Sequence, residues 1–432
     1  MDRSILNIIR ISLFAGSVWL VTSCIQTQDL QVREPNLSDI YNPSRSTLDP
    51  DFSVHHLNDS SSIVYLRVFP SDLLFNEANA EREMRAKLII QYKLLYVDEE
   101  KNRLVLKDSA SMEKVLVYEN VRNSYFTAVP LKAYLGSRYI LQLNMKDGLR
   151  GSENRKFMVI DKTSRFNKQN FRVLSTITGY PVFTEVFSSA DLFRLEFNML
   201  GYDSIYVDYY SLDRTLPRPI FSAAPEIQMR TFPDSTYILP FNDTMTFHLP
   251  EAGIYLFRMT EDVQEGCALY NFGDNFPKIE TPNELLGPLV YLATTAEFRD
   301  LRLEPNRKLA IDNFWLNMAN DMDDARELIR VFYSRVLYSN TYFTSYKEGW
   351  KTDRGMIYII FGPPDMLEKF PDEEVWRYRT RKSNSPLEFK FERKDNHLSY
   401  DDYQLDRSSS STAIWSEAVQ SWKRGRIYAA DY

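Results

Sequence analysis

Apolar and polar residues alternate along most of the first two thirds of the chain, which is the pattern of half-buried β-strands. Between residue 58 and about residue 165, this alternation predicts seven short strands. The strands are expected at 62–69, 87–97, 104–106, 114–118, 125–129, 138–145 and 155–160. Seven strands at this spacing fit an immunoglobulin-like β-sandwich over 58–165, although the cysteines and tryptophan that mark antibody domains are missing from the segment.

The strand pattern starts again after residue 170 and predicts a second sandwich over 172–275. The strands are expected at 182–187, 192–199, 204–210, 227–232, 244–249 and 253–259, with 266–272 as a weaker candidate. Prolines between 217 and 240 separate several of these runs, as proline does in loops. The two blocks share no convincing sequence repeat.

The pattern changes to a helical period near residue 280. Segments 284–296, 305–318 and 323–337 are expected to form helices. Asn283 can cap the first, and apolar residues recur at spacings of three and four in the last. Short strands are then expected at 356–361, 374–380, 387–393 and 398–405, and a last short helix at 414–423. The predicted fold is mainly β, with two tandem immunoglobulin-like sandwiches. An α+β module over 280–432 follows them, with its helices packed on an antiparallel meander.

The first 23 residues have the organisation of a secretory signal. Two arginines precede an uncharged run over 11–21, which is too short to cross a bilayer, since a spanning helix needs about 20 residues. The run ends in VTSC at 21–24, which resembles a bacterial lipobox. This resemblance implies cleavage before Cys24 and attachment of lipid to Cys24, with two or three acyl chains for stable anchoring. An ordinary signal peptide or a signal anchor with an incidental cysteine is the alternative.

Residues 24–57 are poor in apolar residues and contain three prolines, so they are expected to form a flexible tether. His55 and His56 fall within it and are expected to be solvated residues. The residue after Cys24 is Ile25 and not aspartate, which favours the outer membrane over the inner one. Which face of that membrane the protein occupies stays open.

Composition narrows the chemistry. The 432 residues carry a net charge of −7, which argues against nucleic acid as a partner. With only 14 glycines, two cysteines and four histidines, neither a phosphate-binding loop nor a Cys/His metal site is expected, and no cofactor is predicted. Cys267 is expected to be a buried small residue.

The most specific motif lies in the C-terminal module. It consists of GWKTDRG at 349–355 and GPPD at 362–365, with a tryptophan downstream at 376. These segments resemble the GWxTD domain of Bacteroidota cell-envelope proteins over about 300–410. The resemblance brings no established catalytic residues with it. The candidate signature residues are Gly349, Trp350, Thr352, Asp353, Arg354, Gly355, Gly362, Pro363, Pro364, Asp365 and Trp376.

Three roles are open for this signature. In the structural one, Trp350 packs between the helices and the meander while Asp353 and Arg354 form a buried pair. In the recognition role, Trp350, Asp353, Arg354 and Asp365 line a pocket for a peptide or a partner strand. In the catalytic role, Asp353 and Asp365 act as a carboxylate pair, although their spacing is not diagnostic of one.

These observations favour an outer-membrane lipoprotein that is not an enzyme. It would act as a structural or accessory subunit of a cell-envelope complex for secretion, assembly or import. Its partners would be the membrane, through the lipid anchor, and envelope proteins. Two alternatives remain: a glycan- or peptide-binding envelope lipoprotein, and a hydrolase of envelope polymers. The partner's identity and the oligomeric state stay open.

Overall fold

The computed structural model describes residues 36–43, 48–77, 83–101, 103–121, 123–222, 232–370, 372–379, 386–409 and 412–428. The signal peptide and Cys24 therefore lie outside the described residues. Within the described ranges, no helix is long and apolar enough to cross a membrane.

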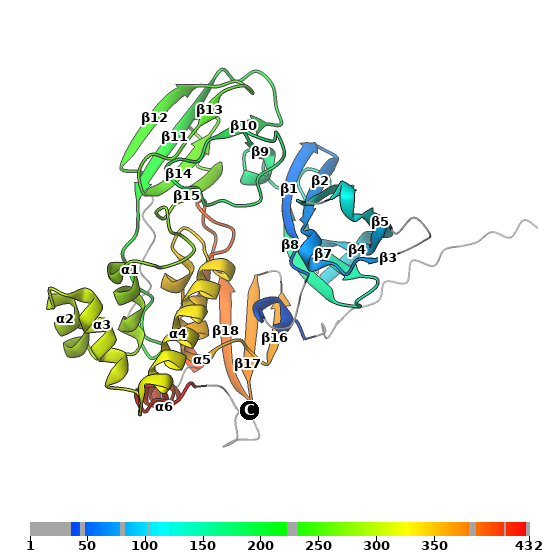
Figure 1. Cartoon of the computed structure of the whole chain (residues 1–432). Helices are drawn as coiled ribbons and strands as arrows, with labels where there is room; N and C mark the ends of the chain where they lie inside the picture. The colour runs from blue at the N-terminus through cyan, green and yellow to red at the C-terminus, as the bar shows by residue number, and fades with distance from the viewer. Residues whose placement is uncertain are drawn as a thin grey trace, which may run out of the picture.

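The first β block contains two antiparallel sheets that share one apolar core (Figure 1). One sheet has the order β1-β2-β6, and the other has the order β3-β4-β7-β8 with β5 paired to β4. The strands are β1 (Asp51–Asn58), β2 (Ser61–Val68), β3 (Asn76–Glu77), β4 (Met84–Asp98), β5 (Arg103–Val117), β6 (Tyr125–Leu131), β7 (Arg138–Asp147) and β8 (Glu153–Asp161). The runs expected at 104–106 and 114–118 are the two ends of the single strand β5. Its middle is largely exposed, so it lacks the apolar alternation that marks a strand in the sequence.

The second β block also has two antiparallel sheets around one core, in the orders β13-β10-β9 and β12-β11-β14-β15. Its strands are β9 (Phe171–Ser175), β10 (Phe193–Phe197), β11 (Ser204–Ser211), β12 (Ser235–Pro240), β13 (Thr246–Phe247), β14 (Gly253–Arg258) and β15 (Cys267–Asn271). The strand expected at 182–187 is wrong: only an isolated bridge joins Val186 to Tyr270 there. Most of the strand expected at 227–232 lies outside the described residues. Both blocks are sandwich-like, and their immunoglobulin-like connectivity stays a prediction.

The C-terminal module places helices against the antiparallel sheet β16-β17-β18-β19 (Figure 1). Its elements are α1 (Pro282–Leu286), α2 (Thr295–Leu303), α3 (Arg307–Leu316), α4 (Met322–Tyr342), α5 (Asp353–Phe361), α6 (Thr412–Lys423), β16 (Met366–Phe370), β17 (Glu373–Tyr378), β18 (Leu387–Arg393) and β19 (Tyr403–Leu405). The helix expected over 284–296 is interrupted, because the 3-10 turn η5 (Gly287–Tyr291) follows α1 and a new helix starts after the N-cap Thr294. Strands β17 and β18 and helix α6 confirm the expected elements at 374–380, 387–393 and 414–423 closely.

Residues 356–361 were expected to form a strand, and this is wrong: they form most of helix α5. The segment is rich in β-branched isoleucine, which favours a strand. However, every residue of α5 is buried. A short, continuous apolar run cannot be assigned to strand or helix by periodicity alone, and here burial on all sides outweighs the intrinsic preference.

The expected tether over 24–57 is wrong for its described part. Residues Ser38–Tyr41 form the 3-10 turn η1, and Leu37 and Tyr41 belong to the core of the C-terminal module. Residues 51–58 form strand β1. His55 and His56, expected to be solvated, are buried in β1, where His56 contacts the Ser62 hydroxyl at 2.9 Å and the Asp161 carbonyl at 2.8 Å. The described part of the segment has a defined structure because distant parts of the chain cover its few apolar residues, such as Leu37 and Tyr41.

Both β blocks contact the C-terminal module. Tyr270 of β15 donates from its hydroxyl to the carbonyl of Leu398 at 2.5 Å, and both side chains belong to one apolar cluster. From the first block, Arg138 on β7 pairs with Asp372 of the module at 3.6 Å. The module is therefore the part of the molecule on which both β blocks and the N-terminal segment converge.

Candidate functional site

The signature residues lie in helix α5 and in the segments on either side of it. Two glycines of the signature, Gly349 and Gly355, allow close contact between backbone segments. A Cβ atom on Gly349 would lie 1.9 Å from the Ser339 carbonyl oxygen of α4, and one on Gly355 would lie 1.9 Å from the Gly349 carbonyl oxygen. Neither position has room for a side chain. Thr352 caps the helix, since its hydroxyl accepts from the Gly355 N–H at 3.0 Å.

Trp350 packs against the helical segment that precedes α2, and not between the helices and the meander as expected. Its ring lies 6.2 Å from the ring of Tyr291, whose hydroxyl donates to the Trp350 carbonyl at 2.7 Å. A Cβ atom on Gly287 would lie 3.0 Å from the indole. Trp350 thus holds η5 against the turn at 349–351 (η6, Gly349–Lys351).

In the structural role considered for the signature, Asp353 pairs with Arg354. The structure shows a different pair, because the partner of Asp353 is Arg407. The Arg407 guanidinium donates to both carboxylate oxygens of Asp353, at 2.5 and 3.0 Å, and the Leu405 N–H donates to Oδ2 at 2.8 Å. Arg407 also donates to the Arg218 carbonyl at 2.9 Å. This buried pair therefore joins the start of α5 to β19 and to the loop after β11. A carboxylate in the first turn also interacts favourably with the helix dipole.

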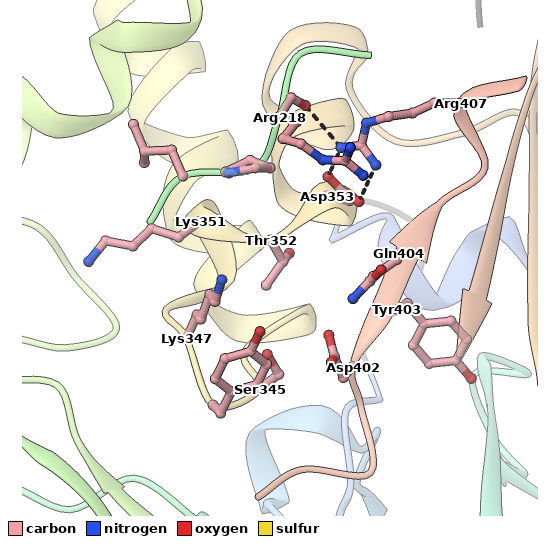
Figure 2. A pocket seen from close by; sticks show the side chains of 13 residues that line it. Arg218, Ser345, Lys347, Lys351, Thr352, Asp353, Asp402, Tyr403, Gln404 and Arg407 are labelled. Carbon is pink, nitrogen blue, oxygen red and sulfur yellow. Dashed lines mark hydrogen bonds and ion pairs between the residues drawn. The ribbon is translucent and has the colours of Figure 1, made fainter. Parts of the chain in front are cut away.

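A small pocket of about 70 Å³ lies beside this pair (Figure 2). Lys347 and Lys351 reach its rim but are already paired, Lys347 with Asp213 at 3.0 Å and Lys351 with Glu348 at 2.7 Å. Burial raises the pKa of Asp402 above its ordinary value. Its lining is mainly polar and comes from the loop after β11, the start of α5 and β19. Among the described residues, no group of three histidine, cysteine or acidic side chains could hold a metal ion.

Glu374 on β17 is the centre of a second cluster. Its side chain is completely buried and accepts from Lys369 at 2.8 Å, Arg354 at 3.2 Å and the Trp376 indole N–H at 3.1 Å. The Tyr41 hydroxyl donates to the same carboxylate at 3.0 Å. One carboxylate thus binds groups from α5, two strands and the N-terminal segment.

The charges of this cluster stabilise one another. Burial alone would disfavour an ionised Glu374, but Lys369 and Arg354 outweigh it and lower the pKa of Glu374 to about 2. Burial and the Glu374 charge raise the pKa of Tyr41, so its hydroxyl remains a donor. The Arg354 guanidinium also stacks 4.2 Å from the centre of the Tyr403 ring.

The far end of α5 holds the GPPD segment. Gly362 has a φ of +82°, and a Cβ atom there would lie 2.8 Å from the guanidinium of Arg335. That guanidinium donates to the carbonyls of Ile359 and Ile360 at 3.1 and 3.0 Å, which satisfies the end of the helix. Burial lowers the pKa of Arg335 to about 10. Pro363 and Pro364 then lead into β16, with Pro364 buried.

Asp365 lies just before β16, at the open end of the β16–β17 hairpin. Its N–H donates to the Arg377 carbonyl at 3.0 Å, and its carboxylate accepts from the Arg379 N–H at 2.8 Å. Asp353 is the first residue of α5 and Asp365 lies beyond its last residue, so the two are at opposite ends of the helix, and each has its own partner. The structure does not bring them together as a carboxylate pair.

Sequence reasoning found Arg354 and Trp376 but missed Glu374, Lys369, Arg407 and Tyr41. A signal for Glu374 exists, because it lies two and four residues before Trp376 and Tyr378, on the same inward face of β17. An acidic residue in phase with buried aromatic residues predicts a buried, paired charge. For Tyr41 and Arg407, no local pattern reveals partners more than 50 residues away.

The fold and this site define a mainly β protein with a C-terminal α+β module built around a signature helix. Residues 253–424 match the family model of the GWxTD domain, so the chain contains a GWxTD domain. The match is wider than the 300–410 expected, and it takes in β14 and β15 of the second β block. The search of curated proteins found no match.

Matches to solved structures include Bacteroides uniformis beta-glucuronidase 2 covalently bound to cyclophellitol-6-carboxylate aziridine. The identity is 13%, the match covers 28% of this chain and 14% of that one, and the TM-score is 0.17. A likeness this low carries no argument about fold or function.

Proposed function

We propose that this protein is an outer-membrane-anchored lipoprotein that is not an enzyme and serves as an accessory subunit of a cell-envelope complex. The anchor would be lipid on Cys24, in a bacterium of the Bacteroidota. The complex would serve secretion, assembly or import, and the protein would contribute binding surfaces on its β blocks and hold them in a fixed arrangement.

One observation supports this proposal most: the charged signature residues are used to join parts of the molecule. Asp353 is bound by Arg407, which also contacts the loop after β11, and Arg354 is bound by Glu374 on β17. Groups held in this way build a rigid joint between domains. A scaffold that presents two β blocks to partners needs such a joint.

The experiment compares the full chain with Cys24→Ala in the native host. We expect the wild-type protein to incorporate labelled fatty acid and to fractionate with the outer membrane. After crosslinking and mild detergent extraction, it should be recovered in an assembly with envelope proteins. Cys24→Ala should lose both the label and the membrane association.

Cys267→Ala is the matched control, because Cys267 is the other cysteine and is buried in β15. It should keep the label and the fractionation of the wild type. A chain that is lipidated but remains strictly monomeric after crosslinking would contradict the accessory role. A wild-type chain that takes up no label would contradict the anchor.

A further inference from the structure

The N-terminal segment 36–41 is bound to the C-terminal module in the way that peptides bind to a sheet edge. The Leu37 N–H donates to the Leu367 carbonyl at 3.0 Å, and the Leu367 N–H donates to the Asn36 side chain at 3.0 Å. The amide of Asn36 donates in turn to the Asp365 carbonyl at 2.7 Å. Because β16 is the edge strand of its sheet, these bonds occupy backbone groups that would otherwise face water.

Tyr41 fills a deep aromatic pocket at the other end of the segment. Its ring lies 4.8 Å from Phe343 and 5.5 Å from Trp376, and its side chain is 5% exposed. The hydroxyl donates to Glu374, and the Tyr41 carbonyl accepts from the Tyr358 hydroxyl at 2.8 Å. Between these two anchors, Asp39 is exposed and the chain makes one 3-10 turn.

The groove keeps its charge balance without the segment. Glu374 has three other donors, on Lys369, Arg354 and Trp376, so the departure of Tyr41 leaves no charge unpaired. The acceptor of Asn36 is a backbone carbonyl at a sheet edge, which water can satisfy. The segment contributes two buried side-chain anchors, Leu37 and Tyr41, and a few hydrogen bonds to a site that other parts of the chain already build.

We propose that this groove is a peptide-recognition site, occupied by the chain's own residues 36–41, which bind reversibly. It would take a segment with asparagine and leucine in sequence, followed by one 3-10 turn that ends in a tyrosine four residues after the leucine. The inference rests on the proposed binding function and names the class of ligand that the module recognises. Three signature residues then have a role in this site: Trp376 packs on the tyrosine, Arg354 holds Glu374, and Asp365 accepts from the asparagine.

The test uses the full chain with a protease site in place of residues 44–47, which separates the segment from β1 after cleavage. The probe is a fluorescent peptide with the sequence of residues 36–43. We expect this peptide to bind the cleaved protein saturably and to displace the native segment. Binding to the uncleaved protein should be at least tenfold weaker, because the covalently attached segment competes at high effective concentration.

Two peptide variants make the result specific. The peptide with Tyr41→Ala should bind at least tenfold more weakly, while the peptide with Pro43→Ala, changed at an exposed position, should bind like the parent. Uncleaved chains could also form a dimer in which the groove of each chain holds the segment 36–41 of the other. Loss of such a dimer in the Tyr41→Ala variant would also support the proposed recognition site.

The proposal is overturned if the cleaved protein never exchanges its segment, if both peptide variants bind equally, or if cleavage alone unfolds the module by circular dichroism. All of these measurements use purified protein without membrane. A negative result here would therefore leave the lipid-anchor experiment with Cys24→Ala unaffected.

Discussion

Glu374 receives more of the buried polar contacts than any signature residue identified from the sequence. The side chains of two cations, Arg354 and Lys369, and of two neutral donors, Tyr41 and Trp376, share its carboxylate. A buried charge network of this kind is costly to build and still more costly to break, because removing one member leaves the others uncompensated. This asymmetry leads to two predictions.

Glu374→Gln should destabilise the protein by about 3–5 kcal/mol, since it removes the counter-charge of the largely buried Lys369 and leaves the buried Arg354 with only the more distant carboxylate of Asp401, at 3.5 Å. The measurement is the free energy of unfolding from denaturant titration. Glu373→Gln is the control on the same strand. Glu373 is partly exposed and pairs with Lys390, so its loss should cost less than about 1 kcal/mol. Equal effects of the two substitutions would contradict the central role of Glu374.

Acid should weaken the protein through the same carboxylate. The pKa of Glu374 is lowered to about 2 in the folded chain, so its contribution is fully present above the ordinary pKa of 4.5 and is lost as the pH falls toward 2. The loss is about 3 kcal/mol over this window. Burial lowers the pKa values of His55 and His56 to about 4. Their contribution to stability is therefore lost mainly as the pH falls from 6.5 toward 4. The difference between wild type and Glu374→Gln isolates the carboxylate, and parallel profiles below pH 4.5 would refute the assignment.

Gly349→Ala should cost about 3 kcal/mol or more, because the added methyl group would meet the backbone carbonyl of Ser339 at 1.9 Å. Gly136→Ala is the comparison. Gly136 has open space around it but a φ of +79°, so only the backbone term of about 1–2 kcal/mol applies. Thermal unfolding of both variants measures the difference. A smaller loss for Gly349→Ala than for Gly136→Ala would mean that α4 and the 349–351 turn can separate freely.

At the residue scale, the sequence pointed to the segment around α5 but did not predict which residues its charged side chains contact. Asp353 and Arg354 are adjacent in the chain, which suggested that they pair with each other. Since consecutive residues at the start of a helix point in different directions, Asp353 reaches Arg407 and Arg354 reaches Glu374. Spacing alone cannot supply partners that approach from β17 or from beyond β19.

At the scale of elements, helix α5 depends on its two ends being held. Thr352 and the Asp353–Arg407 pair hold the start, and Arg335 holds the last carbonyls. Its nine residues would be marginal as an isolated helix. The helix therefore exists because of tertiary contacts, which explains why its isoleucine-rich sequence predicted a strand.

Arg407→Met should loosen the start of α5 and the loop after β11 together, at a cost of about 3 kcal/mol, since Asp353 would remain buried without its partner. Hydrogen exchange should rise in both segments. The double variant Asp353→Asn, Arg407→Met should recover part of the loss, because no unpaired charge remains. Arg326→Met, which removes an exposed pair on α4, should change little. Exchange that rises in only one of the two segments would contradict the coupling.

For the molecule as a whole, the change of period near residue 280 separates the β part from the α+β module, and the break in the strand pattern between 165 and 172 separates the two β blocks. The contacts between the parts could not be predicted from the sequence, because they join surfaces that look like ordinary strand faces or linker. The family match from residue 253 onward agrees with these contacts, since β14 and β15 pack against the C-terminal module.

Leu398→Ala should uncouple the second β block from the module. Leu398 is buried in the cluster that contains Tyr270 and Ile254, and its truncation should cost about 2–5 kcal/mol. We expect calorimetry to show a lower melting temperature for one part and a second, separate transition for the rest. Leu303→Ala, at an exposed position on α2, is the control and should melt like the wild type. A single, unshifted transition in Leu398→Ala would show that the contact does not couple the two parts.

The docking of residues 36–41 also sets an order of events during biosynthesis. Tyr41 and Glu374 are separated by 333 residues, so the segment leaves the ribosome long before its groove has been made. Until the groove has formed, Leu37 and Tyr41 have no binding site in the chain and are accessible to other proteins. A chain that stops before β17 cannot complete this step, so docking of the first residues reports that the last module has been synthesised and folded.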